Sequence, residues 1–189
     1  MVEKVDQSLF LFLNSLNSPF WDDLMWIVSG KLTWLPLYIF ILVLIGIKYK
    51  RRILIIIPII ILTITASDQL SVHAFKELFE RLRPCHEPEL EGLVHIVKGK
   101  CGGKYGFVSS HAANSFAIAM FSLALLKKRW FSITIIIWAT LVGYSRVYLG
   151  VHYPGDVICG AILGIIIGLG FWLLYRRIDI RYPAGERSS

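Results

Sequence analysis

The sequence predicts an all-α membrane protein, a polytopic helix bundle with five transmembrane helices, or six if its N-terminal segment also crosses. Hydrophobic residues make up 56% of the 189 residues and charged residues only 17%, whereas roughly a quarter of a typical soluble domain is charged. The apolar residues form long runs, several of them close to the ~20 residues that cross a bilayer as a helix. Short basic clusters separate these runs. This composition excludes disordered, collagen-like and disulfide-dense proteins.

The five expected spans differ in character. The first is nearly free of charge, and the second begins with an Ile/Leu run that Pro58 interrupts and ends in polar residues. The third combines apolar residues with many small side chains, which favour close helix packing. The spans are expected at residues 34–47, 53–72, 110–126, 130–149 and 157–175.

Residues 1–30 are expected to form a separate N-terminal segment. Its apolar run at 9–13 is strong, but Asn, Pro and Asp residues follow soon after. This pattern favours one or two short interfacial helices on the outer face of the membrane, with a sixth spanning helix as the alternative. The membrane bundle then covers residues 31–178, and residues 179–189 form a cytoplasmic tail.

The basic residues predict which helix ends face the cytoplasm. Three clusters, at 48–52, 127–129 and 176–187, hold eleven of the 20 Lys and Arg residues and only two acids. In a bacterial inner (cytoplasmic) membrane such clusters stay on the cytoplasmic side. Residues 73–109, the turn at 145–156 and the N-terminus are therefore expected on the outer face. The basic clusters at the cytoplasmic helix ends account for the net charge of +7. This charge is therefore not a sign of nucleic-acid binding, and nucleic acid is not expected as a partner.

Polar and ionisable residues gather at the predicted outer helix ends in three clusters, at residues 76–84, 107–115 and 145–156. Charged groups at membrane depth are costly and therefore point to function. Taken singly, each cluster has a plain structural explanation: a solvated helix end, a capped helix start and a turn before a helix. Together they place three cations, two His, a Ser and a carboxylate at one membrane level, which no packing argument requires.

The first two clusters suit an anion. Lys76 and Arg83 are seven residues apart, so on a helix they would share one face, two turns apart. Pro84 then marks the exit into a loop. Ser109 or Ser110 would cap the following helix, whose free N–H groups attract anions.

The third cluster supplies the remaining chemistry. Arg146 adds a third cation, and three cations suit an anion with several oxygens, such as phosphate. Asp156 follows His152 by four residues, within reach of its ring, and could fix the orientation of the imidazole. With His111 in the second cluster, two His residues suit a nucleophile and an acid.

These motifs resemble those of the type 2 phosphatidic acid phosphatase superfamily of membrane lipid phosphatases. Lys-x6-Arg-Pro at 76–84 and Ser-Arg-x5-His-x3-Asp at 145–156 match its first and third motifs completely. The second motif, usually Pro-Ser-Gly-His, reads Val-Ser-Ser-His at 108–111. The Ser in place of Gly keeps the backbone N–H but narrows the phosphate cradle. The resemblance covers about residues 53–175.

The resemblance implies a role for each matched residue. His152 would attack phosphorus and carry a phosphohistidine, and Asp156 would orient it. His111 would protonate the leaving oxygen and then activate water. The phosphate oxygens would be held by Lys76, Arg83, Ser109, Ser110, Arg146 and the helix N–H groups, with no metal and no cofactor. Ligand-type residues in the outer loop (His86, Glu87, Glu89, Glu91 and His95) are read as a solvated loop rather than a metal site.

The sequence analysis therefore predicts hydrolysis of a phosphate monoester or diphosphate on a membrane lipid at the outer face. A phosphate site at headgroup depth leaves the lipid tail between the helices or in the bilayer. The best specific guess is undecaprenyl diphosphate, converted to undecaprenyl phosphate and phosphate. Phosphatidylglycerol phosphate, phosphatidate and lipid A phosphates are the alternatives, and a lipid-phosphate transporter that binds without cleaving is the rival from another class.

Two further patterns support the bundle. Cys85 and Cys101 lie in the outer loop, where an oxidising compartment permits a disulfide. Small residues repeat every four positions in the last span, which predicts a close helix contact within the bundle or a homodimer; they are Gly160, Gly164 and Gly168. Asp68 is an acid near the outer end of its span, and the sequence leaves open whether it pairs with a catalytic cation or faces the bundle.

Overall fold

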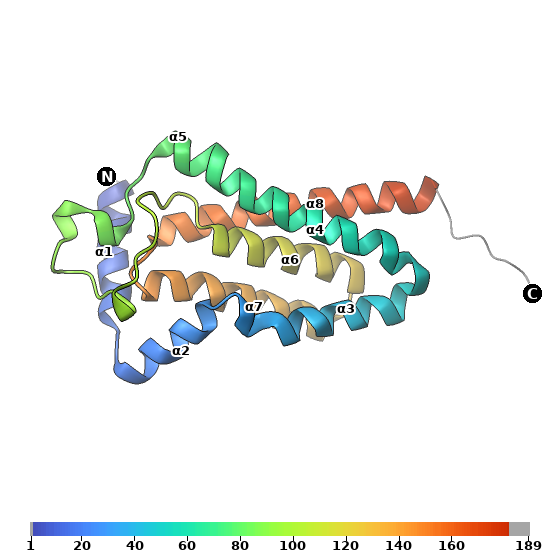
Figure 1. Cartoon of the computed structure of the whole chain (residues 1–189), viewed down its shortest axis with the longest axis horizontal. Coiled ribbons are helices and arrows are strands. Elements are labelled where there is room, and N and C mark those ends of the chain that lie inside the picture. The colour runs from blue at the N-terminus through green and yellow to red at the C-terminus, as the bar shows by residue number, and fades with distance from the viewer. Residues whose placement is uncertain (1, 182–189) are drawn as a thin grey trace, which may run out of the picture.

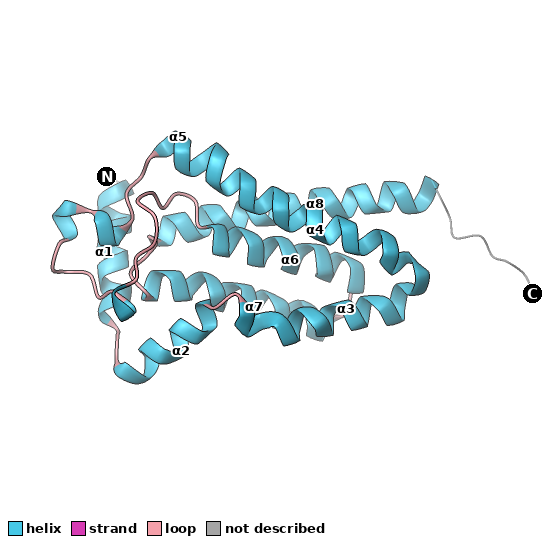
Figure 2. Cartoon of the chain, viewed as in Figure 1, coloured by secondary structure: helices cyan, strands magenta, loops and turns pink. Residues whose placement is uncertain are grey.

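The structure, a computed structural model, describes residues 2–181. Within this range it is helical and contains no strand, apart from one isolated antiparallel bridge between Leu82 and Tyr105 (Figure 2). The helices are α1 (Val2–Ser15), α2 (Pro19–Ser29), α3 (Leu35–Tyr49), α4 (Ile53–Gln69), α5 (Glu77–Phe79), α6 (Ser110–Leu126), α7 (Arg129–Tyr148) and α8 (Pro154–Arg181).

Five long helices, α3, α4, α6, α7 and α8, lie along one axis and form a bundle (Figure 1). They correspond to the five apolar segments expected from the sequence. By length and hydropathy, three stretches of the described chain are candidate membrane spans: Leu32–Phe79, which contains both α3 and α4, Arg129–Tyr148 and Pro154–Ile180. Helix α6 is a shorter apolar helix. The observed architecture is therefore an all-α transmembrane bundle.

The basic clusters meet at one end of this bundle. Lys48 Nζ donates hydrogen bonds to the carbonyl oxygens of Leu125 and Leu126, at 2.7 and 3.0 Å. Arg52 forms an ion pair with Asp179 near the end of α8. The turns that follow α3 and α6 therefore lie beside the C-terminal end of α8, opposite the long loop at residues 80–109 (Figure 1).

The end of α4 that leads into the 80–109 loop departs from the sequence prediction. The chain continues from α4 through a π-helical stretch, Leu70–Lys76, into the short α5. Glu80 then adopts a left-handed conformation with φ of 46°, which ends the helix. The prediction that Lys76 and Arg83 share one helix face is wrong, because Arg83 lies beyond this break in an extended segment.

The glycine stripe of α8 packs against α6 of the same chain. A Cβ atom on Gly160 or Gly168 would lie 2.6 Å from a backbone carbonyl oxygen of α6 or its cap, and one on Gly164 would also meet the α6 backbone. The α6 residues along this contact are small and buried, among them Ala113 and Ala117. The face is filled within the bundle, so it is not free for the homodimer that the sequence left as an alternative.

The N-terminal segment forms two short helices rather than a long span. Helix α1 crosses the end of the bundle beside the 80–109 loop (Figure 1). Phe10 of α1 is fully buried and packs edge-on against Tyr153, with 5.4 Å between ring centroids. Asn14 donates from its amide to the carbonyl oxygens of His95 and Tyr148. At the other terminus α8 continues through 179–181, while the rest of the predicted tail, 182–189, lies outside the described residues.

Candidate active site

A cavity of about 770 Å³ opens at the end of the bundle beside the 80–109 loop. All three polar sequence clusters contribute to its wall, although they come from different elements. The predicted site residues that line it are Lys76, Arg83, Ser110, His111, Arg146 and His152. The structure thus brings together the cations and both imidazoles that the sequence analysis selected.

His152, in this wall, forms a buried pair with Asp156, which lies behind it. His152 is 1% exposed and Asp156 is fully buried, and 3.4 Å separates Nδ1 of His152 from Oδ2 of Asp156. Nε2 of His152 lies 3.3 Å from Nη1 of Arg83. Because a guanidinium can only donate, Nε2 must carry the lone pair, and the ring proton then sits on Nδ1, toward Asp156. This tautomer presents a nucleophilic nitrogen to the cavity.

The surroundings of His152 keep its ring neutral. Burial, and then the positive charges of Arg83 and Arg146, lowers the pKa of His152 well below its usual value of 6.5. A neutral imidazole retains its lone pair over a wide pH range. The site therefore combines a free nitrogen with a strongly positive wall.

Two further groups besides His152 bind the carboxylate of Asp156. Its Oδ2 accepts a hydrogen bond of 3.0 Å from the backbone N–H of Tyr153, and its Oδ1 accepts one of 2.8 Å from Nη1 of Arg81. Nη2 of Arg81 donates to Asp6 of α1 at 2.8 Å, and the guanidinium lies 4.1 Å from the ring centroid of Tyr153. Burial disfavours the charged form of Arg81, but Asp156 and Asp6 outweigh it and raise its pKa.

Arg83 reaches the cavity from a pair of antiparallel loop segments. Its backbone N–H donates to the carbonyl oxygen of Lys104, and Nε donates to that of Tyr105. Its Nη1 also donates to the carbonyl oxygen of Val151 at 3.2 Å. These bonds fix a guanidinium that is only 8% exposed. Arg83 therefore owes its place to the folded loop rather than to a helix.

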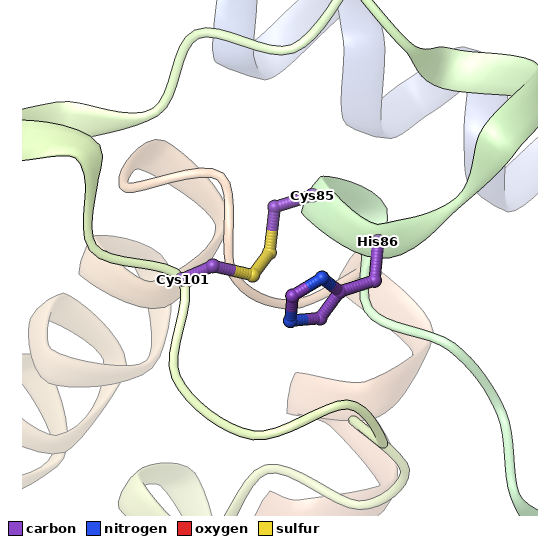
Figure 3. Close-up of side chains that lie close together, drawn as sticks. All are labelled: Cys85, His86 and Cys101. Carbon is purple, nitrogen blue, oxygen red and sulfur yellow. A yellow bond between two sulfur atoms is a disulfide. The ribbon is translucent and has the colours of Figure 1, made fainter.

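A disulfide joins the same two loop segments. Cys85 and Cys101 are bonded, with 6.1 Å between their Cα atoms (Figure 3). Together with His86 they form a cluster whose ligand-type atoms lie within 4.8 Å of one another. Because the two sulfur atoms are bonded to each other, neither is a thiolate that could bind a metal.

Lys76 and Arg146 are each tied to a serine at the cavity wall. Lys76 Nζ donates a 2.8 Å hydrogen bond to Oγ of Ser110, which also accepts one of 2.6 Å from Ser71. Nη1 of Arg146 bonds Oγ of Ser29, at the end of α2. The two cations are therefore pre-positioned by neutral partners, and among residues 2–181 neither forms an ion pair with a carboxylate.

Ser109 and His111 flank the start of α6. Ser109 is the N-cap residue and is fully buried, and its N–H donates to the backbone carbonyl of Asp156 at 3.0 Å. Its side chain does not line the cavity, unlike those of Ser110 and His111. Ser109 thus joins the second motif to the third, while His111 in the first turn of α6 faces the cavity.

Four residues around the site were missed by the sequence analysis: Asp6, Ser29, Arg81 and Gly106. Asp6 and Ser29 lie in the N-terminal helices, outside every motif. Arg81 lies within the first motif, where only its charge could have marked it. A Cβ atom on Gly106 would lie 3.1 Å from Oδ2 of Asp156 and 3.5 Å from Nδ1 of His152, so the loop backbone covers this pair.

Comparison with known proteins agrees with this geometry. The PAP2 superfamily matches residues 57–179. A lipid A 4'-phosphatase of Bacteroides thetaiotaomicron is 45% identical over 173 residues, which cover 90% of this chain and 76% of the relative. One of Porphyromonas gingivalis is 36% identical, covering 91% and 73%. The crystal structure of a transmembrane PAP2-type phosphatidylglycerolphosphate phosphatase from Bacillus subtilis has a TM-score of 0.67 at 26% identity, covering 99% of this chain and 89% of that one.

The family match includes all three motifs, and the solved relative shares the arrangement of the helices. The chain therefore belongs to the PAP2 superfamily, and it is a membrane lipid phosphatase that hydrolyses phosphoric monoesters.

Proposed function

We propose that this enzyme removes a phosphate from the sugar headgroup of lipid A, at the 4' position. One observation carries the proposal. The similarity to the two lipid A 4'-phosphatases spans 173 residues, so it must include most of the segment that precedes the family match at 57–179. That segment supplies Ser29, Lys31 and Trp34 to the cavity wall. We therefore prefer lipid A as the substrate to undecaprenyl diphosphate, which the sequence alone had favoured.

The geometry supports a two-step mechanism. Nε2 of His152 attacks phosphorus, the bond between phosphorus and the sugar oxygen breaks, and His111 donates a proton to that oxygen. In the second step His111 takes a proton from water, whose oxygen attacks the phosphohistidine and releases inorganic phosphate. His152 then recovers its lone pair, so both imidazoles end as they began. Asp156 holds the ring of His152 throughout.

The positive wall supplies the remaining stabilisation. Lys76, Arg83 and Arg146 face the position of the non-bridging oxygens, where negative charge is held during transfer. Phosphoryl transfer depends mainly on positioning and on such charges, and one preorganised donor can contribute about 3 kcal/mol to the transition state. We assign no metal or cofactor to this step, because the chain itself provides three cations.

The same proposal includes a membrane arrangement. Helices α3, α4, α6, α7 and α8 each cross the inner membrane, with the basic turns in the cytoplasm and the cavity at the outer face. Helices α1 and α2 lie on the outer surface, where exposed apolar side chains such as Phe12 and Phe20 would enter the headgroup region.

The test is phosphate release from purified protein in detergent, with a lipid A that carries a single phosphate at the 4' position. Wild type is expected to release phosphate and leave a dephosphorylated lipid by mass spectrometry. His152→Ala is expected to lose at least about 1,000-fold in kcat, because no nucleophile remains. His73→Ala is the matched control, since His73 is exposed and, within residues 2–181, pairs with Glu77 alone. Turnover of other lipid phosphates but not of this one would refute the proposed substrate.

A further inference from the structure

The cavity does not become apolar immediately below the catalytic groups. Asn114 lies three residues after His111 on α6, so the two share a helix face about 4.5 Å apart along the axis. Both line the cavity, as does Asp68 of α4. Nδ2 of Asn114 donates a 3.3 Å hydrogen bond to Oδ1 of Asp68. A polar pair therefore occupies the level directly below His111.

One atom of this pair lacks a partner. Oδ1 of Asn114 is buried and accepts no hydrogen bond within the described part of the chain. Buried polar atoms are nearly always paired, so an unpaired oxygen on a side chain that lines a cavity can be satisfied when that side chain turns toward a partner in the cavity. A carbonyl-type oxygen requires a donor, such as a hydroxyl or an amide N–H.

The position of the pair identifies which part of a substrate it meets. If His111 protonates the leaving oxygen, the group attached to that oxygen must lie beside His111. Asn114 and Asp68 border the position of the leaving group on the side that faces the middle of the bundle. Deeper in the cavity the wall is made largely of apolar side chains, including Ile41, Leu42, Ile60 and Ile118, which suit acyl chains.

We propose that Asn114 and Asp68 form a subsite for the leaving alcohol and that they select a sugar. A glucosamine ring offers hydroxyl or amide donors to Oδ1 of Asn114 and to the carboxylate of Asp68. A simple alkyl or prenyl alcohol offers no donor once its oxygen is esterified, and it would leave these polar groups unpaired. The subsite adds a selectivity element to the proposed function. The identity of the sugar as glucosamine rests on that proposed function.

The test compares two substrates in wild type and in Asn114→Leu. One is the lipid A 4'-monophosphate, and the other is dodecyl phosphate, whose leaving group is a plain alkyl alcohol. Loss of the sugar contacts is expected to lower kcat/KM for the lipid A substrate roughly 10-fold, while kcat/KM for dodecyl phosphate stays within about two-fold. Ser122→Ala is the matched control, because Ser122 lies eight residues deeper on α6 and bonds only the α6 backbone.

A second measurement separates this inference from the proposed function. A glucosamine disaccharide without phosphate is expected to inhibit hydrolysis of dodecyl phosphate by wild type, and Asn114→Leu is expected to weaken that inhibition. If lipid A is not a substrate but the disaccharide effect holds, the subsite stands and the proposed function fails. If lipid A is hydrolysed but Asn114→Leu affects both substrates equally, or neither, the subsite is refuted.

Discussion

At the scale of single residues, the proposed catalytic pair of His152 and Asp156 is held by a cation that the motifs do not name. Arg81 bridges Asp156 and Asp6 with two 2.8 Å contacts. Asp6 also accepts a 2.8 Å hydrogen bond from the N–H of Gly155, at the start of α8. Helix α1 is thereby joined to the carboxylate that orients His152. Arg81 does not line the cavity, so we expect it to influence the reaction through Asp156.

We expect Arg81→Gln to lower kcat about 10- to 100-fold, the range for losing a hydrogen bond to a charged group, and to leave KM within about two-fold. Without Arg81 the buried Asp156 loses the partner of its Oδ1 and no longer fixes the ring of His152. Steady-state kinetics on a lipid phosphate tests this, with Arg81→Lys expected to recover part of the loss. Arg51→Gln, at the opposite end of the bundle, is the control. A raised KM with unchanged kcat would instead make Arg81 a substrate ligand.

The sequence alone identified those site residues whose polar or charged side chains cost free energy at membrane depth. His111, Arg146 and His152 stood out because polar groups at helix ends need a reason to be there. Gly106 and Asp6 carried no such signal, because Gly106 acts through its closeness to Asp156 and His152 and Asp6 acts through its ion pair with Arg81. Ser109 has a structural part that its motif did not reveal, because its backbone N–H bonds α8, while its role as a phosphate ligand stays a prediction.

At the scale of elements, hydropathy located the long helices but could not locate the loop that completes the site. The apolar runs predicted α3, α4, α6, α7 and α8 because a spanning helix needs a continuous apolar sequence. The helix break at Glu80 and the pairing of segments 81–85 and 101–106 depend on contacts distant in sequence. For that reason Lys76 and Arg83 were wrongly placed on one helix.

The contact between α6 and α8 is close because glycine lies where any larger residue would collide with backbone. We expect Gly164→Ala to lower the free energy of unfolding by about 1–3 kcal/mol, the usual cost of overpacking. A Cβ atom at Gly164 would come within 2.9 Å of the amide nitrogen of Ala117. Thermal unfolding in detergent measures this as a lower Tm.

Gly170 of the same helix provides the control for this prediction. A Cβ atom there would meet nothing within 4 Å, and alanine is the better helix former by roughly 0.5–1 kcal/mol. Gly170→Ala should therefore leave Tm unchanged or raise it. Equal losses in both variants would show that α8 and α6 are not in close contact.

At the scale of the whole molecule, the two ends of the bundle differ in charge and in chemistry. The end with Lys48 and Arg52 carries basic side chains bonded to helix termini and to Asp179. The other end holds the disulfide and the cavity. Disulfides persist in oxidising compartments, and basic turns stay in the cytoplasm, so both features agree with the orientation that we propose.

This orientation predicts the labelling of two single-cysteine additions in right-side-out membrane vesicles. Leu93 is 64% exposed in the outer loop, and Lys128 lies in the exposed turn before α7. A membrane-impermeant maleimide is expected to label Leu93→Cys in intact vesicles and Lys128→Cys only after lysis. The parent protein, whose free Cys159 is half-buried in α8, gives the background. Labelling in the reverse order would place the cavity in the cytoplasm, where a reducing environment would open the disulfide and a lipid phosphate of the outer leaflet would be out of reach.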